Sequence, residues 1–168
     1  MDSSLNTDKL SVLQTPKGLG VFAAAPFAPG DSICHFQGPL VRNEDVPKIN
    51  ENFSNDYYVK ISEKYSIGPT DYIEDIFNHS CAPNAGLFLE NGEVYLKAIE
   101  PISVDDEITF DYSTTLDEDD YNLPCLCGSP QCRKIIGSFF DIDPKRQEYY
   151  LEKGAVLPFI ANRFEYKV

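Results

Sequence analysis

Apolar and polar residues alternate over several short stretches of this chain, and a two-residue period is typical of β-strands with one buried face. Residues 87–90 and 93–98 are apolar-rich and are separated by Asn91-Gly92. An Asn-Gly pair tolerates the positive φ angles of a tight hairpin turn, so these two stretches are predicted to pair as a hairpin. Residues 56–61 and 107–112 are two further predicted strands.

Two loops of similar sequence each lead into a predicted strand. Residues 25–33 and 100–108 share an order of proline, apolar, small and turn residues, then Asp, a polar residue and isoleucine. One such echo does not indicate a repeat protein, but it predicts two related loop-strand units within one β-rich domain. The polar residues 41–56 are expected to form a surface insertion, partly helical.

One helix is predicted near the C-terminal end. Asp143 is a suitable N-cap, Pro144 fits the first helical position, and Gly154 fits the position just after the last turn. Residues 156–160 are expected to fold back on the core. Residues 1–10 are interpreted as a polar leader. The pattern therefore predicts one mainly β domain with a few short helices.

The charge balance narrows the range of partners. The chain has 168 residues with 14 Lys and Arg against 27 Asp and Glu, a net charge of −13. Phosphate binding needs clustered cations, so we expect no direct nucleic acid binding and no anionic membrane partner, whereas a basic protein partner fits. Nothing resembles a secretory signal or a membrane span. An intracellular protein, cytoplasmic or nuclear, is expected.

The cysteines point to a metal. Three of the five lie within eight residues, at Cys125, Cys127 and Cys132, with a Gly and a Pro that bend the chain between them. Without an export signal this spacing favours metal binding over disulfides. A structural zinc ion takes four Cys or His ligands. The candidates for the fourth are Cys34, His35, His79 and Cys81. Cys81 is favoured because a proline-containing turn follows it.

Two other stretches carry candidate binding residues. Residues 75–84 combine a histidine, a cysteine, two asparagines and a proline, directly after apolar positions. Gly18 and Gly20 would let the backbone approach a ligand closely. The third glycine and the following helix of a dinucleotide fingerprint are missing, however. A plain turn is the favoured interpretation of the two glycines taken alone.

In combination, these motifs resemble the SET-domain protein lysine methyltransferases. The motifs are Asn78-His79-Ser80-Cys81 with Pro83-Asn84, residues 107–112, Cys125-x-Cys127-Gly128 with Cys132-Arg133, and the glycine motif at residues 17–21. The resemblance covers about residues 10–140. It implies the SET fold, small curved β-sheets with a threaded C-terminal segment, at residues 11–115. A zinc-binding post-SET segment would follow at 116–140, and a C-terminal helix and tail at 141–168.

The resemblance also implies residue roles in an S-adenosylmethionine-dependent protein-lysine N-methyltransferase. Tyr112 and Tyr57 would be catalytic, with Tyr58 a near alternative to Tyr57. Tyr58 and Phe110 would line the substrate channel. The family has Phe or Tyr at position 110, and Phe110 lacks the tyrosine hydroxyl, which predicts di- or trimethylation. The implied cofactor site is Lys17, Gly18, Leu19, Gly20, Asn78 and His79. The implied ligands of one structural zinc ion are Cys81, Cys125, Cys127 and Cys132, with Cys34 left over.

Some positions differ from the family pattern. Asp75 stands where the family often has Arg, Asp105 stands where it usually has Gly, and residues 35–39 differ from its usual Glu-Tyr-x-Gly-Glu. These differences bear on the cofactor contacts and the peptide groove. The acidic balance fits a basic protein substrate such as a histone tail. The alternative function is a catalytically weak SET-like module that binds a peptide or a partner.

Overall fold

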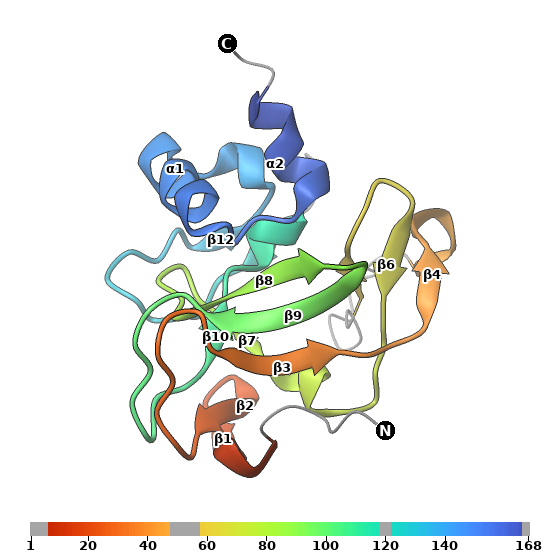
Figure 1. Cartoon of the computed structure of the whole chain (residues 1–168). Coiled ribbons are helices and arrows are strands. Elements are labelled where there is room, and N and C mark those ends of the chain that lie inside the picture. Colours follow the sequence, from red (N-terminus) through yellow and green to blue (C-terminus); the bar gives the residue numbers. More distant parts are fainter. Residues whose placement is uncertain (1–6, 48–57, 118–121, 166–168) are drawn as a thin grey trace.

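Short strands form several small sheets, and two α-helices follow at the C-terminal end (Figure 1). The computed structural model describes residues 7–47, 58–117 and 122–165. Its strands are β1 (Leu10–Thr15), β2 (Gly18–Ala23), β3 (Ser32–Phe36), β4 (Leu40–Arg42), β5 (Val59–Lys60), β6 (Tyr65–Ile67), β7 (Asn78–His79), β8 (Ala85–Glu90), β9 (Glu93–Ala98), β10 (Thr109–Phe110), β11 (Leu123–Pro124) and β12 (Ile135–Ile136). Its helices are η1 (Thr7–Lys9), η2 (Asn43–Asp45), η4 (Ile73–Ile76), η5 (Tyr112–Thr115), η6 (Phe139–Asp141), α1 (Pro144–Lys153) and α2 (Pro158–Glu165), where η denotes a 3-10 helix.

The central sheet is antiparallel, with the strand order β3-β9-β8. Strands β8 and β9 form the predicted hairpin, and Asn91 and Gly92 in its turn have φ angles of 53° and 86°. Every second residue of β9 faces the core, as the alternating pattern predicted. These buried residues are Val94, Leu96 and Ala98.

The remaining strands form small sheets around this one. Three are two-stranded pairs, β1-β2, β7-β10 and β11-β12, and one has the order β4-β6-β5. Strands β7 and β10 run parallel, so Thr109 lies beside Asn78 and Phe110 beside His79. Two motifs that are far apart in the sequence therefore become neighbours in space.

The two loops of similar sequence pair with each other. Phe27 and Ile102 each donate a backbone N–H to the carbonyl of the other, at 3.0 Å. Within each loop an Asp carboxylate accepts a hydrogen bond from the backbone N–H three residues earlier, at 2.8 Å in Asp31 and in Asp106. The predicted relation between the two units is thus confirmed in hydrogen-bond detail.

The residue before each of these aspartates adopts a left-handed backbone conformation. It is Gly30 with φ 93° in the first loop and Asp105 with φ 70° in the second. Glycine adopts this conformation at no steric cost, whereas a residue with a Cβ does not. The glycine usual at position 105 in the family therefore has a conformational reason, and Asp105 is a strained replacement.

Several local predictions need correction. Gly18 begins β2 and Gly20 lies inside it, opposite Leu13, so the turn is at residues 16–17 and not at the glycine pair. The predicted strand 107–112 is reduced to β10, because the side chain of Asp111 caps the following 3-10 helix. The predicted strand 56–61 is reduced to β5, and its residues 56–57 lie outside the described residues, as do residues 48–55 of the expected insertion.

The C-terminal helix α1 has the predicted ends. Asp143 accepts a hydrogen bond from the Lys145 N–H at 3.0 Å, and Gly154 is left-handed with φ 69°. The chain then returns to the core, where Leu157 is fully buried. The expected tail is a second helix, α2, which packs Phe164 against Phe139 and Phe140. Neither α-helix in the described ranges has the length and apolar character needed to span a bilayer.

Candidate functional site

A cavity of about 630 Å³ lies beside the parallel pair β7-β10. This volume is in the usual range for small-molecule sites. Its wall includes Lys17, Gly18, Leu19, Tyr58, Asn78, Phe110 and Tyr112, which were predicted as cofactor, channel or catalytic residues. The predicted residues Gly20 and His79 are not in the wall, and Tyr57 lies outside the described residues.

The part of the cavity wall formed by Lys17 and Asn78 is polar, and it is called the polar end below. Asn78 donates its side-chain amide to the carbonyl of Leu19 at 2.9 Å and to Glu107 Oε1 at 2.8 Å. Lys17 Nζ lies 3.3 Å from Glu107 Oε2. Glu107 therefore ties the glycine motif to the Asn-His motif. It was missed as a site residue, because nothing in the sequence indicates that it pairs with Lys17, 90 residues earlier.

The two glycines of the first motif have different structural reasons. Gly18 has φ 111°, and a Cβ there would meet no atom within 4 Å, so its backbone conformation explains the glycine. A Cβ on Gly20 would lie 2.8 Å from Glu107 Oε1 and 3.0 Å from Asn78 Nδ2. Close packing against the polar end of the cavity therefore explains Gly20.

Another part of the wall is formed by aromatic rings, and it is called the aromatic end below. The ring centroids of Phe110 and Tyr112 are 4.9 Å apart, and Phe36 packs edge-on against Phe110 at 6.3 Å. Tyr112 donates its hydroxyl to the carbonyl of Phe77 at 2.7 Å. Phe36 and Phe77 also belong to the wall. They were not predicted as site residues, although Phe77 directly precedes the Asn-His motif.

Four cysteines converge at one place in the described chain. The sulfurs of Cys81, Cys125, Cys127 and Cys132 all lie within 4.8 Å of one another. The Cys81 and Cys125 sulfurs are 3.7 Å apart. A tetrahedral zinc ion with Zn–S bonds of about 2.3 Å would separate its sulfurs by about 3.8 Å. The donor set and its spacing therefore fit zinc.

Two other candidates for the fourth ligand, Cys34 and His35, make their contacts outside the cysteine cluster. Cys34 is buried in the main core, apart from the four clustered cysteines, and burial raises the pKa of its thiol to about 12. His35 stacks on Tyr95 at 4.5 Å. The backbone N–H of Arg133 donates to the Cys81 sulfur at 3.4 Å, a contact that supports a metal-bound thiolate.

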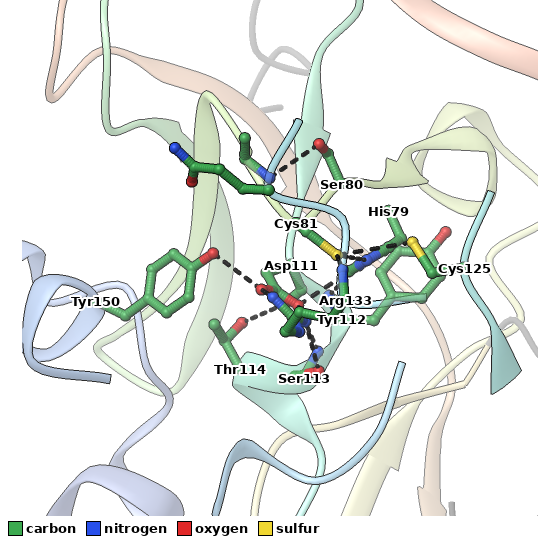
Figure 2. A network of polar contacts seen from close by, with 12 residues as sticks. His79, Ser80, Cys81, Asp111, Tyr112, Ser113, Thr114, Cys125, Arg133 and Tyr150 are labelled. Atoms are coloured by element: carbon green, nitrogen blue, oxygen red, sulfur yellow. Dashed lines mark hydrogen bonds and ion pairs between the residues drawn. The ribbon is translucent and has the colours of Figure 1, made fainter. Parts of the chain in front are cut away.

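His79 lies between the cysteine cluster and Tyr112 (Figure 2). Its Nδ1 accepts the backbone N–H of Tyr112 at 3.2 Å, and its Nε2 is 3.3 Å from the Cys81 sulfur. Burial lowers the pKa of His79 to about 4, so the ring is neutral near pH 7. Because Nδ1 is an acceptor, the proton belongs on Nε2, facing the sulfur.

Asp75 has a local structural role. Its carboxylate accepts hydrogen bonds from the Thr70 N–H at 3.0 Å, the Thr70 hydroxyl at 2.9 Å and the Asp71 N–H at 2.8 Å. These bonds close the turn that precedes η4. An arginine has no acceptor for such donors, so the departure from the family pattern changes how this turn is held.

A family model described as the SET domain matches residues 18–113, more than half of the chain. This chain belongs to the SET-domain family of protein lysine methyltransferases. The mainly β SET fold and the cysteine cluster after the SET domain, consistent with a post-SET segment, agree with the sequence prediction. The family comprises S-adenosylmethionine-dependent histone-lysine N-methyltransferases.

Curated relatives and solved structures are similar to the SET domain of this chain. "Histone-lysine N-methyltransferase mes-4" of Caenorhabditis elegans is 31% identical over 144 residues, which cover 72% of this chain and 16% of that protein. "Histone-lysine N-methyltransferase 2D" of Homo sapiens is 30% identical over 132 residues, covering 70% of this chain and 2% of that protein. The chain thus spans only a small part of these relatives.

Two solved structures have the same fold. The structure of KRYPTONITE in complex with mCHH DNA, an H3(1-15) peptide and SAH has a TM-score of 0.62 at 27% identity. The matched region covers 76% of this chain and 29% of the KRYPTONITE chain. The methyltransferase domain of human SETMAR has a TM-score of 0.65 at 21% identity, covering 77% of this chain and 58% of that one, and supports the fold alone.

Proposed function

We propose that this chain is an S-adenosylmethionine-dependent protein-lysine N-methyltransferase with Tyr112 as its catalytic tyrosine. The observation that carries the proposal is one cavity whose wall runs from Lys17, Gly18 and Asn78 to the rings of Phe110 and Tyr112. A methyl donor at the polar end and a lysine at the aromatic end would meet inside it. The similar KRYPTONITE structure, which contains SAH and an H3 peptide, supports this assignment.

The polar end would hold the cofactor. Its proposed residues are Lys17, Gly18, Leu19, Gly20, Asn78 and His79, with the last acting through its backbone. Lys17 offers a cation for a carboxylate, and Gly18 leaves open space beside the backbone. When bound, S-adenosylmethionine would supply a methyl group that a neutral lysine amine accepts, with a thioether as the leaving group.

The aromatic end would prepare the lysine. A free lysine amine is protonated at pH 7, and only its neutral form has the lone pair needed for attack. Burial among the rings of Phe36, Phe110 and Tyr112 disfavours the charged form. The Tyr112 hydroxyl donates to the Phe77 carbonyl at 2.7 Å, and this bond fixes the position of the phenol beside the proposed amine site. Tyr57 and Tyr58 are proposed to complete the channel.

We also propose that the product is di- or trimethyllysine. Phe110 is 4% exposed and lies against Tyr112. A tyrosine here would place a hydroxyl in the space that a growing methylammonium group needs. The phenylalanine leaves this space apolar, which suits successive methyl additions.

The proposed substrate is a basic protein such as a histone tail. A net charge of −13 would attract such a chain from a distance. The curated relatives named above are histone-lysine methyltransferases, which supports a histone target and a nuclear location, with a cytoplasmic one still compatible. No direct contact with nucleic acid is proposed.

Residues 116–140 are proposed to form the post-SET segment around one structural zinc ion, after a SET domain at 11–115. Leu123 of this segment is part of the cavity wall. The metal would therefore fix one side of the cavity as well as the segment itself. Residues 141–168 would form a C-terminal helix and tail, and residues 1–10 a polar leader.

Transfer of labelled methyl groups tests the function. Core histones and a lysate are incubated with tritiated S-adenosylmethionine and the protein. Label is expected on a basic protein band, and Tyr112→Phe is expected to reduce it at least a hundredfold, because a hydroxyl that aligns and accepts is lost. Absence of label on every protein would favour the peptide-binding module and contradict the enzyme.

A further inference from the structure

Asp111 is a buried carboxylate that directly precedes Tyr112 in the sequence. It is 1% exposed. Its two oxygens accept from the guanidinium of Arg133 at 2.7 and 2.8 Å, and Oδ2 also accepts the hydroxyl of Tyr150 at 2.9 Å. The N–H of Ser113 donates to Oδ1 at 3.1 Å. Figure 2 shows these donors converging on the carboxylate from different segments.

Two of the donors come from outside the region that matches the SET-domain model. That match ends at residue 113. Arg133 directly follows Cys132, a member of the cysteine cluster, and Tyr150 lies on α1. The segment after β10, the cysteine-rich segment and helix α1 therefore meet at the side chain of Asp111. Nothing in the family match requires a helix at this point.

The charges around Asp111 are balanced. A carboxylate removed from water needs a cation and hydrogen bonds, and the two-pronged contact with Arg133 provides both. Tyr150 adds a neutral donor, because burial and the neighbouring carboxylate raise its pKa well above the usual range. Without the Tyr150 hydroxyl the ion pair would persist, but Oδ2 would lose one of its two donors.

Asp111 is linked to Tyr112 through the helix η5. Asp111 caps η5, whose first residue is Tyr112. The backbone N–H of Tyr112 is held by His79 at 3.2 Å, and its hydroxyl by the Phe77 carbonyl at 2.7 Å. A shift of the Asp111 carboxylate would therefore strain both contacts. Methyl transfer depends on alignment, and small displacements reduce its rate strongly.

We infer that Asp111 is a positioning residue for Tyr112 and that the hydroxyl of Tyr150 on α1 helps to hold the Asp111 carboxylate in place. The C-terminal helix α1 would therefore support the active site. The inference rests on the proposed function for the role of Tyr112. The structural part of the inference, that Tyr150 is coupled to residues 109–116, does not depend on the proposed function.

Tyr150→Phe tests the inference, because it removes one hydroxyl and keeps the ring beside Phe139. Tyr149→Phe is the matched control, since the neighbouring Tyr149 donates its hydroxyl to Glu100 at 2.6 Å, away from Asp111. Two quantities are compared in the full chain. They are kcat and KM with core histones, and the hydrogen–deuterium exchange rate of residues 109–116.

For Tyr150→Phe we expect kcat to fall about tenfold with KM within about twofold, and exchange to become about tenfold faster. Tyr149→Phe is expected to match the wild type. Equal behaviour of the two variants would overturn the inference, and so would faster exchange with an unchanged kcat, since Tyr150 would then only stabilise the fold. An inactive wild type would instead overturn the proposed function, and the exchange rates would still decide the coupling.

Discussion

Phe110 differs from a tyrosine by a single hydroxyl and belongs to the cavity wall beside Tyr112. We expect Phe110→Tyr to convert a di- or trimethylating enzyme into one that stops mainly at monomethyllysine, because the hydroxyl takes up space and can hold a water beside the amine. Mass spectrometry of the product at saturating cofactor measures the outcome.

Phe88→Tyr is the matched control for this change, because Phe88 lies on β8 and is not in the cavity wall. It adds the same hydroxyl away from the site and should leave the product distribution unchanged. A Phe110→Tyr protein that still forms trimethyllysine would contradict the proposed role of this ring.

Two buried cysteines allow a direct test of the metal ligands. Cys81 is in the cluster of four sulfurs, whereas Cys34 is in the main core. We expect Cys81→Ala to lower bound zinc from about one equivalent to a small fraction, since a structural site needs all four ligands. Cys34→Ala should retain the zinc. Metal analysis of the purified proteins decides this, and equal zinc in both variants would exclude Cys81 as a ligand.

At the scale of elements, the paired loops make a prediction about strain. Asp105 is exposed and left-handed, at the position equivalent to Gly30. Asp105→Gly should relieve this strain and raise the free energy of unfolding by about 0.5 kcal/mol, because the steric gain exceeds the added entropy of the unfolded chain. Urea denaturation measures the change.

Gly30→Ala is the companion variant in the other loop. It places a Cβ on a left-handed residue and should lower the free energy of unfolding by about 1 kcal/mol. If both variants shifted stability in the same direction, the conformational explanation of the two loops would be wrong.

Elements defined by neighbouring residues were predictable from the sequence. The turn at Asn91 and Gly92 and the ends of α1 follow from local backbone preferences. The cysteine spacing predicted for the same reason that Cys125, Cys127 and Cys132 lie close together, as they do. The second helix α2 was missed, because Pro158 begins a short segment whose stability comes from Phe139 and Phe140, contacts that no local pattern reveals.

The site itself was only partly predictable. The family resemblance supplied Phe110 and Tyr112, and both lie in the cavity wall. The residues that hold the motifs together were not predicted. Glu107 and Arg133 act through partners far away in the sequence, and such pairs are fixed by the path of the chain and not by residue preference. His79 was considered as a metal ligand, but its hydrogen bond to the Tyr112 backbone was not predicted, for the same reason.

For the whole molecule, the distribution of charge predicts a salt effect. Residues 1–132 contain 7 Lys and Arg and 22 Asp and Glu, whereas residues 133–168 contain 7 and 5. The acidic part carries the cavity wall. We expect kcat/KM for a basic peptide to fall several-fold between about 20 and 200 mM salt, because screening weakens long-range attraction.

A peptide in which the flanking Lys and Arg are replaced by Gln is the control. Its kcat/KM should be lower at low salt and should change little as salt is added. Equal salt dependence for the two peptides would mean that the net charge of the chain does not guide its substrate.

The pairing of the two loops has a consequence for the order of folding. Phe27 bonds to Ile102, Phe22 bridges to Glu107, and Lys17 pairs with Glu107, so the β1-β2 pair cannot make its contacts with the rest of the fold until residue 107 is available. A ribosome adds about 5–20 residues per second, so the synthesis of residue 107 follows that of β2 by roughly 4–17 s. The glycine motif is therefore synthesised early, but its contacts with Glu107 form only after the second loop has been made.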